Sequence, residues 1–185
     1  MLLFEYIAIA FSMVFSFTVL RLVGGLPYAT RPGRVYWVHL LFVMTALIYV
    51  LNAFWAFWSY ATVEWTYARY ILALASPIAQ YFTVAILVPG EPHKVTSWRD
   101  YYYASRRRFF IGLIIMTTVS ALSTTELADM PLRHPVRLGQ LSILTVGIVG
   151  LVFQSPRVQA ALALVALIGV AGFGALILAL PGGLS

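Results

Sequence analysis

Six apolar stretches, each about as long as a membrane-crossing helix, occupy most of this 185-residue chain. A helix rises about 1.5 Å per residue, so about 20 apolar residues cross the roughly 30 Å hydrocarbon core of a bilayer. Composition agrees, because 62% of the residues are hydrophobic, 10% are charged and the mean hydropathy is +0.90. A soluble domain of this length could not bury that much apolar surface. The sequence therefore predicts an all-α, polytopic integral membrane protein with six transmembrane helices in a single membrane domain, residues 1–185.

The spans are expected at about residues 2–23, 36–60, 66–88, 98–125, 138–154 and 158–180. Gly24–Gly25 and Pro27 are expected to end the first span, because glycine is conformationally permissive and proline lacks an amide hydrogen. A cleavable signal peptide is the competing interpretation, but Glu5 stands where a basic cluster would be and no small-residue cleavage site follows. The fourth helix is expected to begin outside the bilayer core, where Ser97 and Asp100 have the spacing of a capping box.

Basic residues divide unequally between the two sides of the predicted topology. Nine lie beside the loops after the first, third and fifth spans: Arg21, Arg31, Arg34, Lys94, Arg99, Arg106, Arg107, Arg108 and Arg157. The other side holds only Arg69, Arg133 and Arg137. Because positive residues are retained in the cytoplasm, both termini are expected to be extracytoplasmic, in a cytoplasmic (plasma) membrane. The net charge of +6 then indicates contact with anionic inner-leaflet lipids rather than with nucleic acid.

Polar side chains of the second and third spans fall on narrow helical faces at about 100° per residue. We expect these residues to form a polar interior: Thr45, Tyr49, Asn52, Ser76, Gln80 and Thr83. Such residues are costly in lipid and face other helices or a wet cavity. Two interpretations stay open. The stripes line a binding cavity or permeation path, with Pro77 freeing a backbone carbonyl, or they hold the helices together by hydrogen bonds.

Charged residues suggest a further site on each side of the membrane. On the outer side we expect an electrostatic cluster of Glu5, Arg69 and Glu126, because an arginine one turn inside the boundary needs a partner or water. Snorkelling of Arg69 to the interface is the alternative. On the inner side, contact with anionic headgroups is expected of Trp98, Arg99, Arg106, Arg107 and Arg108. These arginines could equally serve only to fix the topology.

The last two spans differ from the others, since Arg157 is the one ionisable residue between positions 138 and 180 and small residues recur there. They are expected to pack as an apolar hairpin against the first four helices or against another subunit. No cysteine is present, which excludes disulfides and thiol catalysis. His39, His93 and His134 are dispersed, and no HExxH or GxSxG element occurs. We therefore expect no catalytic residues, no metal and no cofactor.

These features favour a non-enzymatic membrane protein that binds or conducts a small solute or lipid through a polar interior of the first four helices. A channel or transporter of this kind is expected to form a homo-oligomer. The alternative is an accessory or scaffold subunit of a larger membrane complex, which suits a chain whose short loops leave no soluble domain. A lipid-modifying enzyme would need a nucleophile or an acid pair within the membrane, and the sequence has neither.

Overall fold

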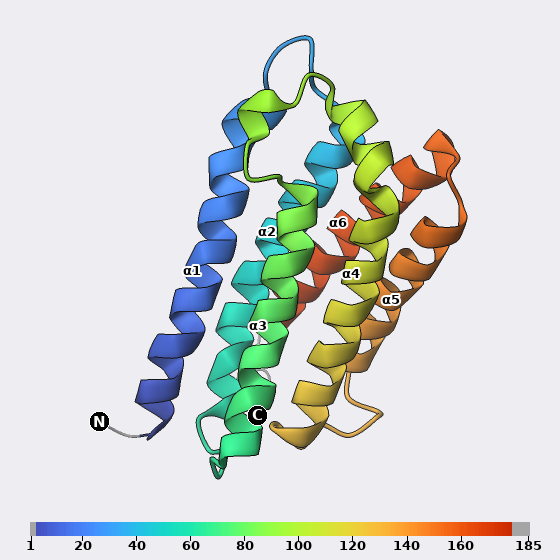
Figure 1. Cartoon of the computed structure of the whole chain (residues 1–185). Coiled ribbons are helices and arrows are strands. Elements are labelled where there is room, and N and C mark those ends of the chain that lie inside the picture. The colour runs from blue at the N-terminus through green and yellow to red at the C-terminus, as the bar shows by residue number, and fades with distance from the viewer. Residues whose placement is uncertain (1–2, 179–185) are drawn as a thin grey trace.

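The computed structural model describes residues 3–178, and in this range the chain is helical with no strand (Figure 1). The helices are α1 (Leu3–Ala29), α2 (Trp37–Ala56), α3 (Tyr67–Leu87), α4 (Trp98–Glu126), α5 (Val136–Val152) and α6 (Pro156–Leu178). Two short 3₁₀ turns follow α2 and precede α4, η1 (Phe57–Tyr60) and η2 (Pro92–Lys94). The predicted start at Leu2 and end at Leu180 lie outside the described residues.

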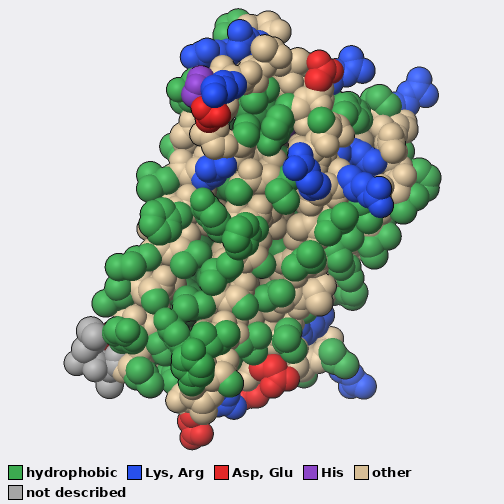
Figure 2. All heavy atoms as spheres, in the orientation of Figure 1, with side chains coloured by type: hydrophobic (Ala, Val, Ile, Leu, Met, Phe, Trp, Pro, Cys, Tyr) green, Lys and Arg blue, Asp and Glu red, His purple; other side chains and the backbone are tan. Residues whose placement is uncertain are grey.

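All helices except α5 are long and apolar enough to cross a membrane. α5 is apolar throughout but has 17 residues, which places it at the short limit for a crossing. Exposed apolar side chains occur on the helices of the described chain, and on the face shown in Figure 2 they form a belt across the middle, with most charged side chains toward the two ends. A soluble protein rarely exposes so continuous an apolar surface. The chain is an integral membrane protein of the helical class.

The six helices close into a ring whose order differs from their order in the sequence. Each packs mainly on two neighbours, so that the ring runs α1, α3, α4, α5, α6, α2 and back to α1. Smaller contacts of α2 with α3 and α4 cross the middle of the ring. The α5–α6 hairpin therefore packs within its own chain, with α5 against α4 and α6 against α2.

Charge divides the two ends of this bundle. α1 begins and α6 ends at one end, while the loops after α1, α3 and α5 form the other (Figure 1). We call the latter the arginine-rich end, because most Lys and Arg side chains gather there (Figure 2). The predicted grouping of the loops on two sides is thus present in the fold.

α1 does not end at Gly24–Gly25, contrary to the sequence-based expectation. The helix continues to Ala29 with Pro27 in its last turn. Gly25 has a packing role instead, because a Cβ atom at this position would lie 2.4 Å from a methyl carbon of Val88, at the end of α3. The glycine lets the two helices approach closely, and about one turn of α1 follows this contact.

The predicted start of α4 is confirmed. Ser97 is the N-cap, and its side chain accepts a hydrogen bond from the backbone amide of Asp100 at 3.3 Å. The indole nitrogen of Trp98 donates to the carbonyl of Tyr28 at 2.9 Å. This bond holds the first turn of α4 against the end of α1, so both helices build the arginine-rich end.

Candidate functional site

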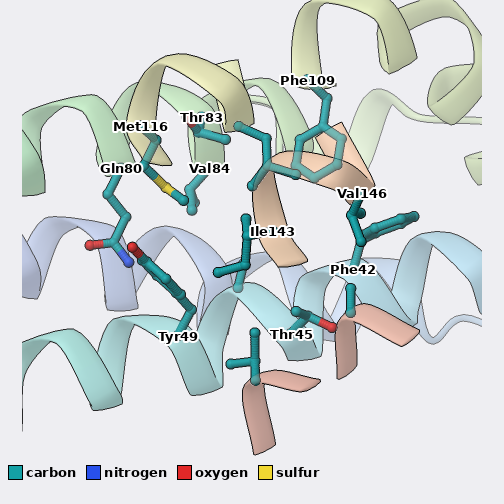
Figure 3. A pocket seen from close by; sticks show the side chains of 14 residues that line it. Phe42, Thr45, Tyr49, Gln80, Thr83, Val84, Phe109, Met116, Ile143 and Val146 are labelled. Carbon is teal, nitrogen blue, oxygen red and sulfur yellow. The ribbon is translucent and has the colours of Figure 1, made fainter. Parts of the chain in front are cut away.

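An internal cavity of about 50 Å³ lies inside the helix ring (Figure 3). Five helices contribute to its wall and α1 does not, which corrects the expectation of an interior formed by the first four helices. The residues that line it are Phe42, Thr45, Ala46, Tyr49, Gln80, Thr83, Val84, Phe109, Leu113, Met116, Ile143, Val146, Ala166 and Val170. None of them is exposed at the protein surface. The α5–α6 hairpin, predicted to be peripheral, supplies an apolar side of this wall.

Four of the six predicted interior residues reach the cavity, and these are Thr45, Tyr49, Gln80 and Thr83. The two threonine hydroxyls donate to carbonyls of their own helices, one turn earlier, at 2.8 and 2.9 Å. The hydroxyl hydrogens of Thr45 and Thr83 are therefore not available to a solute in the cavity. Ser76 is half-buried in α3 and does not line the cavity.

Asn52 lies outside the cavity and ties two helices together. Its Nδ2 donates to the carbonyl of Val170 in α6 at 3.1 Å. A Cβ atom at Gly174 would lie 2.5 Å from the same nitrogen, so the glycine leaves room for the amide. The structure thus places Asn52 in the α2–α6 contact, as expected of a residue that holds helices together, and not in a permeation path.

Gln80 is the distinctive polar group of the cavity wall. Its side chain is 3% exposed, and its Nε2 has no hydrogen-bond partner among the described residues. Leaving a buried donor unpaired costs about 1–3 kcal/mol. In Figure 3 the Gln80 amide and the Tyr49 hydroxyl point toward the same end of the cavity. The surface open to the cavity is apolar, made of aliphatic, aromatic and thioether groups, and the unpaired Gln80 Nε2 lies buried in the wall behind it.

Pro77 lies inside α3 and is buried, on the helix that carries Gln80. We expected it to free a backbone carbonyl toward the interior. The Ser123 hydroxyl of α4 donates to the carbonyl of Leu72 at 3.2 Å, in the turn before the proline. Leu72 precedes Ala73, the residue whose carbonyl lacks its usual helical donor because of Pro77, and Pro77 itself does not line the cavity.

In residues 3–178 the predicted outer cluster is not held by an ion pair between Arg69 and Glu126. Arg69 donates through Nη1 to the carbonyl of Glu64 at 2.8 Å, in the loop before α3. Glu126 is exposed in the last turn of α4, and no ion pair within 4 Å joins it to Arg69 in residues 3–178. Glu5 is exposed in the first turn of α1. Arg69 therefore holds a local backbone group.

Arg137 is the anchored cation at this end, and the sequence analysis missed it. Its side chain is 8% exposed and forms five hydrogen bonds of 2.7–3.0 Å that join the start of α5 to α4 and to the loop between them. The acceptors are the carbonyls of Ala121 and Met130 and the side chains of Thr124, Thr125 and Gln140. The sequence features that could have indicated this buried arginine are Thr124 and Thr125 at the end of the fourth span and Gln140, three residues after Arg137.

Arg106 is buried at the arginine-rich end and does not contact the inner leaflet, which corrects its predicted role. It is 5% exposed and donates through Nη1 to the carbonyls of Gly150 and Phe153, with a longer contact of 3.4 Å to Leu151. These carbonyls end α5, where a helix carries partial negative charge and unpaired acceptors. The guanidinium thus caps the C-terminal end of α5, and its partners are backbone carbonyls rather than a carboxylate.

Two further side chains complete this cap. Gln159 of α6 is fully buried and donates through Nε2 to the carbonyls of Gly150 and Phe153. Its Oε1 accepts a hydrogen bond from the hydroxyl of Tyr102 at 2.5 Å. The turn between α5 and α6 is therefore held from two sides, by α4 and by α6.

Trp98 is also buried, so the exposed members of the predicted inner-leaflet set are Arg99, Arg107 and Arg108. The Trp98 ring stacks on His39 of α2, with ring centroids 4.7 Å apart. His39 is 1% exposed, and neither ring nitrogen has a hydrogen-bond partner in the described chain. A lone histidine near the end of a span gave no signal of this packing.

Within residues 3–178 no group of three His, Asp or Glu side chains is arranged to hold a metal ion. The cavity is suited to binding rather than to acid–base or nucleophilic chemistry, since its wall combines one amide, one phenol and two threonine hydroxyls with apolar groups. Comparison of the chain with protein-family models, with curated proteins and with solved structures gives no match.

Proposed function

We propose that this protein is a non-enzymatic membrane protein that binds a small, uncharged, hydrogen-bond-accepting solute in the cavity between α2 and α6. The observation that carries the proposal is the Gln80 amide, which lines the cavity with an unpaired Nε2. Buried polar groups are otherwise bonded in proteins, so an unpaired donor in the wall of a cavity suggests an acceptor supplied from outside the chain, which the donor reaches when the Gln80 side chain turns toward the cavity. The side chain of Tyr49 lies beside it.

The cavity limits the size and charge of the solute. A volume of about 50 Å³ accommodates about three water molecules or one solute of a few heavy atoms, which excludes a lipid from this site. No Lys, Arg, Asp or Glu lines the wall, so an ion would meet no compensating charge. Thioether and aromatic groups at Met116, Phe42 and Phe109 suit the apolar part of such a molecule.

The proposal includes an orientation in a cytoplasmic (plasma) membrane, with the arginine-rich end in the cytoplasm and both termini outside. Passage of the solute would require movement at that end, where the rings of Phe42 and Phe109 pack edge to face with centroids 5.4 Å apart. Binding is the primary activity proposed, and conduction follows only if these rings separate.

Side-chain amide NMR of ¹⁵N-glutamine-labelled protein in detergent tests the binding step. Acetone serves as the probe, because it accepts hydrogen bonds and has four heavy atoms. The Gln80 amide signal is expected to shift and saturate, whereas that of Gln159, whose amide is already bonded, is expected to stay in place. Equal movement of both signals, or a change that does not saturate, would contradict the proposal.

Filling the cavity gives a matched pair of variants. Ala166→Leu adds three carbons to the wall and is expected to abolish the acetone response while leaving Gln80 in place. Ala161→Leu makes the same change at an exposed position of the same helix and should keep the response. Shrinkage of proteoliposomes in urea, measured by light scattering with the same variants, then tests whether the solute also crosses.

A role as an accessory or scaffold subunit is the second candidate, and the satisfaction of most interior polar groups between helices favours it. Asn52, Ser123, Arg106 and Arg137 all bond groups on a neighbouring helix or loop, which makes the bundle a rigid framework. Purification in mild detergent separates the two candidates. A homo-oligomer that responds to acetone supports solute binding, and stoichiometric co-purification of other subunits without that response supports a scaffold.

A further inference from the structure

An open groove with both polar and apolar lining residues lies on the surface of the arginine-rich end, between the loop after α3 and the first turns of α4. Its volume is about 600 Å³, and it is lined by Pro89, Gly90, Glu91, Lys94, Val95, Thr96, Ser97, Asp100, Tyr101 and Ala104. The groove lies just beyond the end of α3, where the apolar belt gives way to charged side chains (Figure 2). It is separate from the cavity that contains Gln80, since the two share no residue.

Arg21 of α1 stands beside this groove with part of its guanidinium already fixed. Nε donates to the carbonyl of Val88 at 2.8 Å, and a Cβ atom built on Gly90 would lie 3.6 Å from Nη2. The bond to Val88 orients the fork, so that its terminal nitrogens lie next to the groove residue Gly90. Arg21 is only half-buried, and a ligand can therefore reach it.

Arg108 brings a second guanidinium to the same place. It is exposed on α4, four residues after Ala104 and seven after Tyr101, so all three residues share one face of the helix. The Tyr101 hydroxyl donates to the carbonyl of Ile86 at 2.7 Å, which holds this face of α4 against the end of α3.

The two arginines have no anion to balance them within the described chain. No carboxylate lies within 4 Å of either, and the ion pair nearest in sequence, Lys94–Glu91 at 2.7 Å, joins two other side chains of the groove. Guanidinium groups bind phosphate oxygens through paired, charge-assisted hydrogen bonds. Arg21 bonds the carbonyl of Val88, directly after the apolar helix α3 ends, and lipid phosphates lie just outside the hydrocarbon core that such a helix crosses.

We infer that Arg21 and Arg108 bind the phosphate of an anionic glycerophospholipid, whose polar headgroup occupies the groove. The charges support an anionic lipid, because the cations in or beside the groove, Arg21, Arg34, Arg108 and Lys94, outnumber the two carboxylates that line it, Glu91 and Asp100. Ser97, Thr96 and Asp100 supply hydroxyl and carboxylate groups that can bond a headgroup carrying hydroxyls. This site differs from the predicted general contact with the inner leaflet, because the buried Arg106 is not part of it.

Delipidated protein in a neutral detergent, titrated with single lipids and examined by native mass spectrometry, tests the site. Phosphatidylglycerol is expected to bind in a 1:1 complex, phosphatidylcholine and phosphatidylethanolamine more weakly, and diacylglycerol, which lacks the phosphate, not at all. Arg108→Gln is expected to lower the affinity for phosphatidylglycerol roughly tenfold, the scale of one charge-assisted contact at a membrane surface. Arg157→Gln, which removes an exposed charge at the same end of the bundle, is the control and should bind as the wild type does.

Arg21→Gln is the second variant, and its loss of binding is interpreted only if its thermal unfolding in lipid-free detergent matches that of the wild type. If it fails that check, Arg108→Gln carries the test, since its exposed side chain is not part of the packed interior. Equal losses in Arg108→Gln and Arg157→Gln would overturn the proposal in favour of non-specific attraction. Displacement of the lipid by millimolar inorganic phosphate would overturn it in favour of a soluble phosphate ligand. The acetone response of Gln80 is independent of all these outcomes.

Discussion

Replacement of Gln80 by leucine is expected to make the protein more stable while removing its proposed binding activity. In solute-free protein the Nε2 of Gln80 is buried without a partner, and an unmet buried donor costs about 1–3 kcal/mol. Leucine is similar in size and carries no polar group, so the substitution removes this cost and adds apolar contact with the wall. The expected gain in the free energy of unfolding is about 1–3 kcal/mol.

Thermal unfolding followed by intrinsic tryptophan fluorescence measures this gain, because the chain has five tryptophans and no cysteine for thiol dyes. For a protein of this length about 1 kcal/mol corresponds to a shift of about 2–4 °C, so the midpoint should rise by roughly 2–12 °C. Acetone should then no longer stabilise the variant, whereas it should stabilise the wild type.

Gln159→Leu is the matched control with the opposite expected sign. This glutamine is equally buried, but both ends of its amide are bonded, to the Tyr102 hydroxyl and to the last carbonyls of α5. Its loss leaves these groups unmet and should lower the free energy of unfolding by about 2–4 kcal/mol, from two to three lost bonds. If Gln80→Leu destabilised the protein as Gln159→Leu does, the Gln80 amide would be bonded in the native state and the reasoning refuted.

Three further predictions concern the helix contacts. Gly150→Ala should lower the free energy of unfolding by about 1–3 kcal/mol, because the new Cβ would lie 2.4 Å from the ring of Phe110. Gly139→Ala is the control, since no atom lies nearer than 3.5 Å to its new Cβ, and it should be neutral or stabilising by up to about 1 kcal/mol. Thermal unfolding of the two variants checks this. Arg106→Met should speed amide hydrogen exchange in the α5–α6 turn, and exchange unchanged from the wild type would refute its capping role. Asn52→Leu should weaken the α2–α6 contact by about 0.6–2 kcal/mol but leave the acetone response intact, in contrast to Gln80→Leu.

The spans themselves could be predicted because the bilayer imposes their length and apolarity on the sequence. The capped start of α4 could be predicted as well, since Ser97 acts through its immediate neighbours. The end of α1 predicted at Gly24–Gly25 was wrong. In water such a pair often ends a helix, but in a membrane the backbone must stay bonded, and Gly25 instead permits contact with Val88.

The site was predictable only in part, for a geometric reason. Helical periodicity places Tyr49 and Gln80 on inward faces but does not say which helix each face meets. The ring order puts α6 against α2, so Asn52 bonds a carbonyl of α6 although it shares a stripe with the cavity residue Tyr49. The burial of Arg106 depends in the same way on the end of α5 lying beside α4, a contact between segments about 45 residues apart.

The position of α2 between α1 and α6 has a consequence for biosynthesis. α2 leaves the ribosome well before its partner α6, which is made more than a hundred residues later. Throughout that interval the Asn52 amide faces acyl chains with no carbonyl to bond, and the ring stays open on one flank. A nascent polypeptide that stops after α5 would therefore expose a polar seam to lipid, which offers membrane proteases a means to distinguish truncated from finished molecules.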